Sequence, residues 1–170
     1  MEGSKTITME LTTSDLLSQM EEHSYYLGEA LKSDPQVIEL AAKLQASSDD
    51  YSILKDFVQA GATRLGNIAS RVIGKTVYEW ADSGKTSITF TTYAVANFMD
   101  AQVETFKDTM LNYLSYYVLS KWLKIIKPDE APRFEQELVT LEEDMRQLGA
   151  QRDKPTRTSS STNEDTEESE

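Results

Sequence analysis

The chain contains no cysteine and a single histidine, His23. The lack of cysteine excludes thiol catalysis, disulfide frameworks and cysteine-rich zinc sites. One histidine also leaves little material for a histidine-based metal site. We interpret His23 as a structural residue, because no serine, cysteine or second histidine arrangement accompanies it as catalysis would require.

Basic residues are in short supply as well, with 17 Lys and Arg against 29 Asp and Glu, a net charge of −12. Proteins that hold nucleic acid by neutralising phosphates need clustered Lys and Arg, so this class is disfavoured. The charge does not exclude a protein that DNA passes without being bound. No window reaches the roughly 18 uncharged apolar residues of a membrane span, and the N-terminus lacks the apolar run of a secretory signal. We expect a soluble protein that is not exported by a classical route.

A chain of 170 residues is the size of one ordinary domain, which can bury a core without a metal or a disulfide. The last stretch, residues 151–170, contains no aliphatic or aromatic side chain and is rich in Ser, Thr and Glu. It cannot bury enough apolar surface to offset the entropy of ordering. The sequence therefore predicts a folded domain over residues 1–150 and a disordered acidic tail over 151–170.

Helix-start signatures precede three apolar stretches in the first half of the chain. The first predicted helix has candidate caps at residues 12–14 and is weakened or ended by Gly28. The second has a cap at 33 or 34, followed by a proline in its first turn. The third has a cap at 48 or 49 and apolar residues at helical spacing, and Gly74 is placed to stop it.

Two further helices are predicted in the second half, the longer over about residues 95–126 and the other beginning at Pro132. Between the two halves, residues 75–92 are rich in β-branched and aromatic residues, with alternation in "SITFT". These residues predict a hairpin around "ADSGK". A lone hairpin is marginal in water and must lie on the helices or on a partner.

In the predicted hairpin, Val77 and Trp80 are expected to pair across from Ile88 and Phe90. The fold class that follows is mainly α, a helical bundle of about five helices with one β-hairpin insertion.

The run "SGKT" at residues 83–86 resembles the end of a phosphate-binding loop. That loop needs a glycine five residues before its Gly-Lys pair, where this chain has Glu79, and it needs a strand leading into a helix. We therefore interpret the run as a hairpin turn and predict no cofactor. Carboxylate pairs such as Glu142 and Glu143 are better explained as a solvated helix face.

The stretch "LNYLSYYVLSKWL", residues 111–123, is the most apolar part of the chain. Its apolar positions continue to residue 126 and wrap most of the way around a helix, which is typical of a central core helix. Two lysines near its end exclude a membrane span at this length. The alternative is that one flank, formed by Tyr113, Tyr116 and Tyr117, contacts a neighbouring subunit, because tyrosine tolerates half-wet contacts.

A folded core of about 150 residues has little room for eight tyrosines, two tryptophans and five phenylalanines. Some aromatic residues should therefore lie at its margins, and the hairpin adds Trp80 and Phe90 to the candidates for a subunit interface. On this hypothesis, replacing Tyr113 and Tyr116 by Ser should impair assembly and leave the melting temperature nearly unchanged.

The order of these features resembles a known group of proteins. An N-terminal "ITMELTTSDLLSQMEEHSYYLG", a helix at "SSDDYSILKDFVQAG", a strand at "TSITFT" and a closing "QRDKPTR" flank the aromatic helix. That helix ends in a tryptophan followed by a "PDEA" turn, an aromatic residue and a glutamate; the residues are Trp122, Pro128, Asp129, Glu130, Ala131, Phe134 and Glu137. The chain resembles small neck proteins of tailed bacteriophages, the head–tail connector or head-completion proteins, especially those of phages of Bacteroidetes-type hosts. Pro132 departs from the helix-forming residue expected after the turn.

The resemblance implies a non-enzymatic virion structural protein of the neck, assembled in the host cytoplasm. Its copies would form a ring on the portal protein, below which tail or other neck proteins bind, and would enclose the DNA channel with DNA only as passing cargo. Ring contacts are heterologous and need apolar surface, and an acidic wall would repel DNA phosphates. The alternative is a cytoplasmic helical adaptor or regulator that binds a partner protein through an aromatic surface. An enzyme that uses the scattered carboxylates ranks third.

Overall fold

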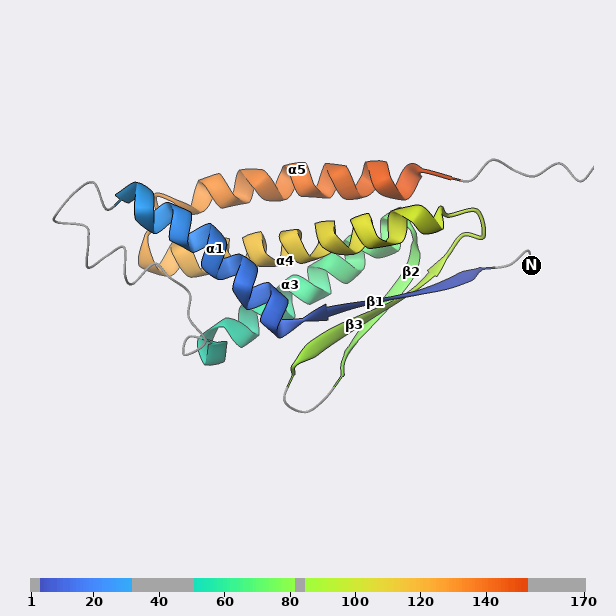
Figure 1. The fold of residues 1–170 in the computed structure, drawn as a ribbon, viewed down its shortest axis with the longest axis horizontal. Helices are drawn as coiled ribbons and strands as arrows, with labels where there is room; N and C mark the ends of the chain where they lie inside the picture. Colours follow the sequence, from blue (N-terminus) through green and yellow to red (C-terminus); the bar gives the residue numbers. More distant parts are fainter. Residues whose placement is uncertain (1–3, 32–50, 82–84, 153–170) are drawn as a thin grey trace, which may run out of the picture.

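The computed structural model describes residues 4–31, 51–81 and 85–152. Their elements are β1 (Lys5–Thr12), α1 (Thr13–Leu31), α3 (Tyr51–Val72), β2 (Gly74–Trp80), β3 (Ser87–Ala94), the short 3-10 helix η2 (Asp100–Gln102), α4 (Val103–Ile126) and α5 (Ala131–Ala150) (Figure 1). The prediction of a mainly helical protein is confirmed, but these residues form four α-helices and a three-stranded antiparallel sheet. The predicted helix with a cap at 33 or 34 lies outside the described residues.

The N-terminal strand β1 is an element that the sequence analysis missed. It pairs antiparallel with β3 over its whole length, from Lys5 opposite Ala94 to Thr12 opposite Ser87, and the strand order is β1-β3-β2. Ile7, Met9 and Leu11 are buried and the residues between them are exposed, the two-residue alternation of a half-buried strand. The predicted hairpin is therefore not alone, because a third strand completes the sheet.

Helix α1 begins where the sequence predicts. Thr12 is the cap: its Oγ1 accepts a hydrogen bond from the backbone N–H of Asp15 at 3.1 Å. Gly28 does not end the helix, which continues to Leu31. Helix α3 ends at Val72, and Gly74 follows with φ +147°, a conformation that favours glycine. A Cβ at Gly74 would also meet the backbone carbonyl of Tyr93, so this position requires glycine.

The hairpin predicted near residues 75–92 is present as β2 and β3. Trp80 pairs with Ile88 as expected. Val77 instead pairs with Thr91, and Phe90 is opposite Tyr78. The predicted pairing is wrong because residues directly opposite each other must lie on the same face of a sheet. Phe90 points toward the helices, whereas Val77 is on the outer face and 47% exposed.

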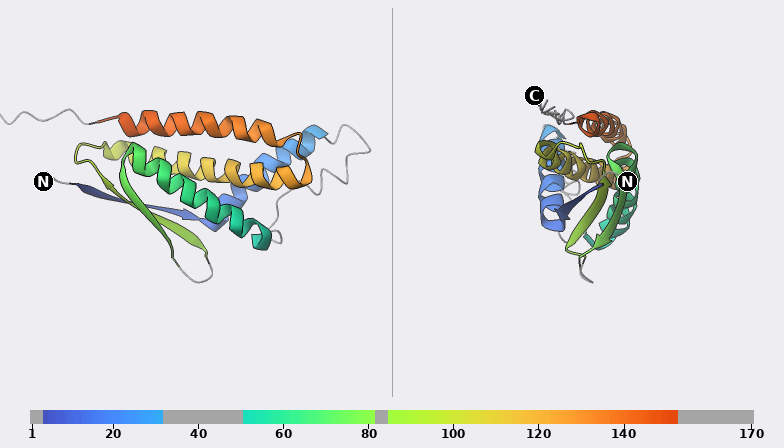
Figure 2. Two further views of the ribbon diagram at one scale, coloured as in Figure 1. Left: turned by 180° about the vertical axis from the view of Figure 1, so that it is seen from behind. Right: turned by 90° about the vertical axis from the view of Figure 1, so that its right-hand side faces the viewer.

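Helix α4 is the central element. It packs against α5 along its length and also contacts α3, α1 and β1 (Figures 1 and 2). Its buried residues are Phe106, Met110, Tyr113, Leu114, Ser115, Val118, Leu119, Ser120, Trp122 and Leu123. The prediction of a central core helix is confirmed. The sheet lies against α3 and α4, and α5 lies on the opposite side of α4 (Figure 2).

The helix predicted over residues 95–126 begins only at Val103. The preceding residues hold η2 and the buried Phe98, which forms an isolated antiparallel bridge with Arg152. This bridge places the chain after α5 beside the start of η2. Residues 151 and 152 of the predicted tail are thus described, and the remainder of that prediction lies outside the described residues.

Candidate functional site

The structure separates the five predicted interface residues into buried and partly exposed ones. Tyr113 and Phe90 are each 0% exposed, so their assignment to an accessible margin is wrong. Phe90 lies on the helix-facing side of the central strand, and Tyr113 lies on the side of α4 that α5 covers. Both belong to the hydrophobic core. Tyr116, Tyr117 and Trp80 are partly buried.

Tyr113 is buried together with a hydrogen-bond partner for its hydroxyl. The hydroxyl donates to Glu142 Oε1 of α5 at 2.9 Å, and the same oxygen accepts from Arg64 Nη2 of α3 at 2.7 Å. Burial, followed by the hydrogen bond to the carboxylate, raises the pKa of Tyr113 well above its usual value. The hydrogen bond to Glu142 raises the pKa of Arg64 further. This network joins α3, α4 and α5.

Tyr116 lies between two aromatic rings from different helices. The ring centroid of His23, on α1, is 4.6 Å away, and that of Phe134, on α5, is 5.5 Å away. Burial raises the pKa of Tyr116. Burial also lowers the pKa of His23, and the negative charge of Glu22 partly offsets this second shift. Tyr116 therefore holds α1 and α5 on α4, and the environment of His23 fits its interpretation as a structural residue.

Trp80 fastens the hairpin to α3. Its indole N–H donates to Gln59 Oε1 at 2.7 Å, and Gln59 Nε2 donates to the Tyr78 hydroxyl at 2.6 Å. On its other side, Lys85 Nζ lies 5.2 Å from the ring centroid. These contacts account for the tryptophan as a residue that attaches β2 to the helices.

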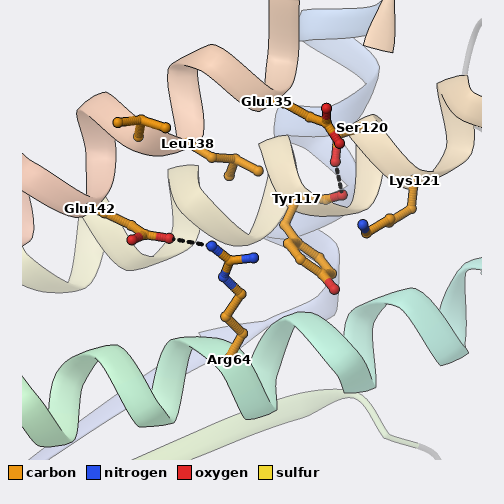
Figure 3. A pocket seen from close by; sticks show the side chains of 8 residues that line it. Arg64, Tyr117, Ser120, Lys121, Glu135, Leu138 and Glu142 are labelled. Atoms are coloured by element: carbon orange, nitrogen blue, oxygen red, sulfur yellow. Dashed lines mark hydrogen bonds and ion pairs between the residues drawn. The ribbon is translucent and has the colours of Figure 1, made fainter. Parts of the chain in front are cut away.

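Tyr117 is the candidate that lines a hollow on the surface. This hollow, which we name the α3–α5 groove, runs between α3 and α5 with α4 as its floor (Figure 3). Its lining residues are Arg64, Tyr117, Ser120, Lys121, Glu135, Leu138, Val139 and Glu142. Gly61 permits the close approach of α3 to this floor, because a Cβ there would lie 2.6 Å from Leu114 Cδ1 and 2.9 Å from Tyr117 Cδ1.

Charged groups flank the tyrosine ring in the α3–α5 groove. Lys121 Nζ lies 5.2 Å from the Tyr117 ring centroid, and no carboxylate among the described residues lies within ion-pair distance of it. Glu135 pairs with Lys124, and this hydrogen bond lowers the pKa of Glu135. Arg64 is already paired with Glu142. Among the described residues Lys121 therefore forms no ion pair, although its charge also helps to lower the pKa of Glu135 in the same groove.

The size and polarity of the groove limit what it can receive. Its volume is about 180 Å³, below the roughly 300–1,000 Å³ of pockets that hold drug-sized ligands. Leu138 is buried in its wall, and Val139, 70% exposed, forms an apolar rim. A space of this kind suits one or two side chains of another protein, with an acidic group beside Lys121 and an apolar group on Val139.

The motif behind the family resemblance forms the turn between α4 and α5. Trp122 and Phe134 are buried, whereas Pro128 and Asp129 are exposed. Glu130 Oε1 accepts from Lys127 Nζ at 3.3 Å. Pro132 lies in the first turn of α5, where proline costs the helix no hydrogen bond. The motif therefore has a structural explanation in the packing of this helical turn.

The sequence analysis did not identify two residues of the site. Arg64 was not considered, and Glu142 was interpreted as part of a solvated helix face, although its side chain is 19% exposed and binds Tyr113 and Arg64. These residues are 78 positions apart, so no local pattern connects them. By contrast, the alternation of "TITMELT" did signal β1 and could have been used.

The "SGKT" run lies between two antiparallel strands, not between a strand and a helix as a phosphate-binding loop requires. Among residues 4–31, 51–81 and 85–152, no three His, Asp or Glu side chains are grouped to hold a metal ion. None of the described helices is long and apolar enough to span a membrane. Comparisons with family models, curated proteins and solved structures give no significant match.

Proposed function

We propose that the chain is a non-enzymatic structural subunit of a tailed-bacteriophage neck. In this proposal its copies form a ring between the portal and the tail and surround the DNA channel, with DNA as passing cargo. The protein is assembled in the host cytoplasm and resides in the virion. The resemblance of the "KWLKIIKPDEAPRFEQE" region to neck proteins supports this assignment.

The α3–α5 groove is the observation that carries the proposal. It offers a partly buried tyrosine, an apolar rim and Lys121, which forms no ion pair among the described residues. Tyrosine is enriched at protein–protein contacts, and an acidic group of a partner placed beside Lys121 would add charge complementarity. A heterologous ring needs one subunit to present such a groove and the next to present a different, complementary face.

The charge of the chain supports the proposed place beside DNA. With a net charge of −12, the subunit repels phosphates, and a ring of copies multiplies this repulsion. An acidic chain also supplies many carboxylates that could enter the groove of a neighbouring copy beside Lys121. The same groove would serve the alternative function, a cytoplasmic adaptor or regulator bound to an acidic partner protein.

The location of the protein, in the virion or outside it, distinguishes the neck function from the adaptor function. We expect a reconstruction of the intact particle, or gold-labelled antibodies on purified virions, to place the protein in a ring between portal and tail. Absence of the protein from purified virions would contradict the neck function and favour the adaptor.

A variant pair tests the groove itself. In a phage that depends on this gene, Tyr117→Ser combined with Lys121→Glu should yield heads that fail to join tails. Tyr93→Ser, which removes a 44% exposed tyrosine from the outer face of β3, is the matched control and should assemble normally. Equal assembly by both variants would show that the groove is not an assembly contact.

A further inference from the structure

The two edges of the three-stranded sheet differ in how they are covered. At the β2 edge, the backbone N–H of Thr76 donates to Ser70 Oγ of α3 at 2.9 Å, and that hydroxyl donates to the carbonyl of Thr76 at 3.3 Å. A side chain of α3 therefore occupies both outward backbone groups at the middle of β2. A further strand therefore cannot pair with Thr76 at the middle of this edge.

At the β1 edge, the ladder geometry shows which backbone groups point outward. Thr13 N–H donates to the carbonyl of Thr86 at 2.8 Å, which continues the ladder one step past the pairing of Thr12 with Ser87. In an antiparallel pair the hydrogen-bonded residues alternate, so the odd residues of β1 bond to β3. The even residues Thr6, Thr8 and Glu10 direct their N–H and C=O groups away from the sheet.

No described residue accepts or donates at these outward groups. The backbone hydrogen bonds outside the regular ladders include none from Thr6, Thr8 or Glu10. In Figure 1, β1 lies on the near side of the sheet, and no labelled element is drawn in front of it. The end view in Figure 2 shows β1 between α1 and β3, and Figure 1 shows that α1 continues beyond the end of β1 and does not run along its edge.

The usual protections of an edge strand are also missing from β1. Natural edges are blocked by proline, by bulges or by a lysine that projects over the edge. β1 has no proline, and its eight residues pair with β3 without interruption. Lys5 is held by Asp100 and the carbonyl of Phe98, and Glu10 accepts from Ser87 Oγ at 2.6 Å. Neither charged side chain therefore blocks the edge of β1 against another strand.

We infer that β1 is the pairing edge for a second copy of this chain, in an antiparallel β1–β1 contact about a two-fold axis at Thr8. In this register Thr8 is opposite Thr8 of the second copy, and Thr6 is opposite Glu10. The outward backbone N–H and C=O groups of Thr6, Thr8 and Glu10 then pair with the same groups of the second copy. The side chains of the three residues stay on one face of the sheet, and no glutamate is opposite another glutamate. The result is a continuous six-stranded sheet.

The open edge also explains why the assembly stops at two copies. Each chain has one open edge among its described strands, because Ser70 closes the other. A contact that uses the same edge in both copies is isologous and closes on itself. The inference concerns the free protein and goes beyond the proposed neck function, which uses the α3–α5 groove.

Proline substitution at Thr8 tests the contact directly. Thr8→Pro removes an N–H that the monomer does not use and places a ring at the centre of the two-fold contact, whereas Thr8→Val keeps the N–H. Edge pairing alone buries less than the roughly 1,600 Å² of a standard interface, so we expect a weak dimer. Sedimentation over a concentration series should show dimers for the wild-type chain and for Thr8→Val, and monomers for Thr8→Pro.

Amide exchange followed by NMR supplies a second readout that needs no variant. With rising concentration, the amides of Thr6, Thr8 and Glu10 should exchange more slowly, whereas the amide of Thr76 should not change. A chain that stays monomeric throughout the series overturns the inference, as does a dimer without protection at the three β1 amides. A folded Thr8→Pro variant that dimerises like the wild type also overturns it. Failure of virion assembly would leave this result unaffected, so the two proposals fail separately.

Discussion

Tyr113 and Tyr117 lie one helical turn apart on α4, with ring centroids 6.4 Å apart, yet their surroundings differ. Tyr113 is fully buried beneath α5, and its hydroxyl donates to Glu142. Tyr117 lines the α3–α5 groove beneath Lys121. The same residue type is thus part of the core at one position and part of a candidate contact surface four residues later. Packing of the neighbouring helices decides between these roles.

The largest expected effect comes from shortening the two tyrosines in turn. Tyr113→Ser leaves a cavity and deprives Glu142 of a donor, so we expect it to lower the free energy of unfolding by about 3–5 kcal/mol. Tyr117→Ser should cost less, about 1–2 kcal/mol, because its ring packs against the core but keeps part of its surface in solvent. Urea denaturation of both variants measures the difference. Equal losses would show that the two tyrosines have the same role.

Two glycines of α3 provide the next test, because the groove depends on how closely α3 approaches α4. A Cβ at Gly61 would lie 2.6 Å from the buried Leu114, so Gly61→Ala should destabilise the protein by about 1–3 kcal/mol. At Gly66 the nearest atom, Tyr78 Cδ1, would lie 3.4 Å away. Gly66→Ala should therefore stabilise the helix by about 0.5–1 kcal/mol. A stabilising Gly61→Ala in thermal melts would mean that α3 does not pack this closely on α4.

Alkaline pH separates the buried tyrosine from the others. Because the pKa of Tyr113 is raised in the folded protein, its stabilising effect is complete below the unfolded value of 10.0 and is lost as pH rises toward the folded value. Above pH 10, the wild-type chain should lose up to about 1.4 kcal/mol per pH unit relative to Tyr113→Phe. Parallel stability curves for the two proteins between pH 8 and 11 would contradict the burial of this hydroxyl.

The smallest effect is expected in the groove. Lys121→Gln removes the cation over the Tyr117 ring and should cost at most about 0.5–1 kcal/mol. In a double-mutant cycle, Lys121→Gln in the Tyr117→Ser background should have no further effect on unfolding. A strictly additive loss would show that the two side chains do not interact.

Most helix boundaries could be predicted because they depend on local chemistry. Thr12 caps α1 with its own side chain, and Gly74 ends α3 because it adopts a positive φ. The start of α4 could not be predicted in this way, since Phe98 forms an isolated bridge with Arg152, a residue more than fifty positions away. β1 was predictable only in part. The alternation of its apolar and polar residues can be seen in the sequence, but its partner strand is about eighty residues away.

The site was less predictable than the fold. The composition of residues 111–126 indicated a buried helix with an aromatic flank, but its three tyrosines could not be ranked by exposure from helical spacing alone. Their exposure depends on where α3, α5 and α1 cross α4. Arg64 and Glu142 acquired a role only because α3 and α5 place them beside Tyr113.

By itself, the sequence determined the elements with local signals: the capped helices, the hairpin, the acidic charge and a central helix too apolar for the surface. Only the tertiary structure decided which tyrosine is core and which lines the groove, and that β1 leaves one sheet edge open while Ser70 closes the other. The physical reason is that caps, turns and periodicity arise from neighbours in the chain. Burial and edge pairing depend on atoms that residues distant in the sequence bring together.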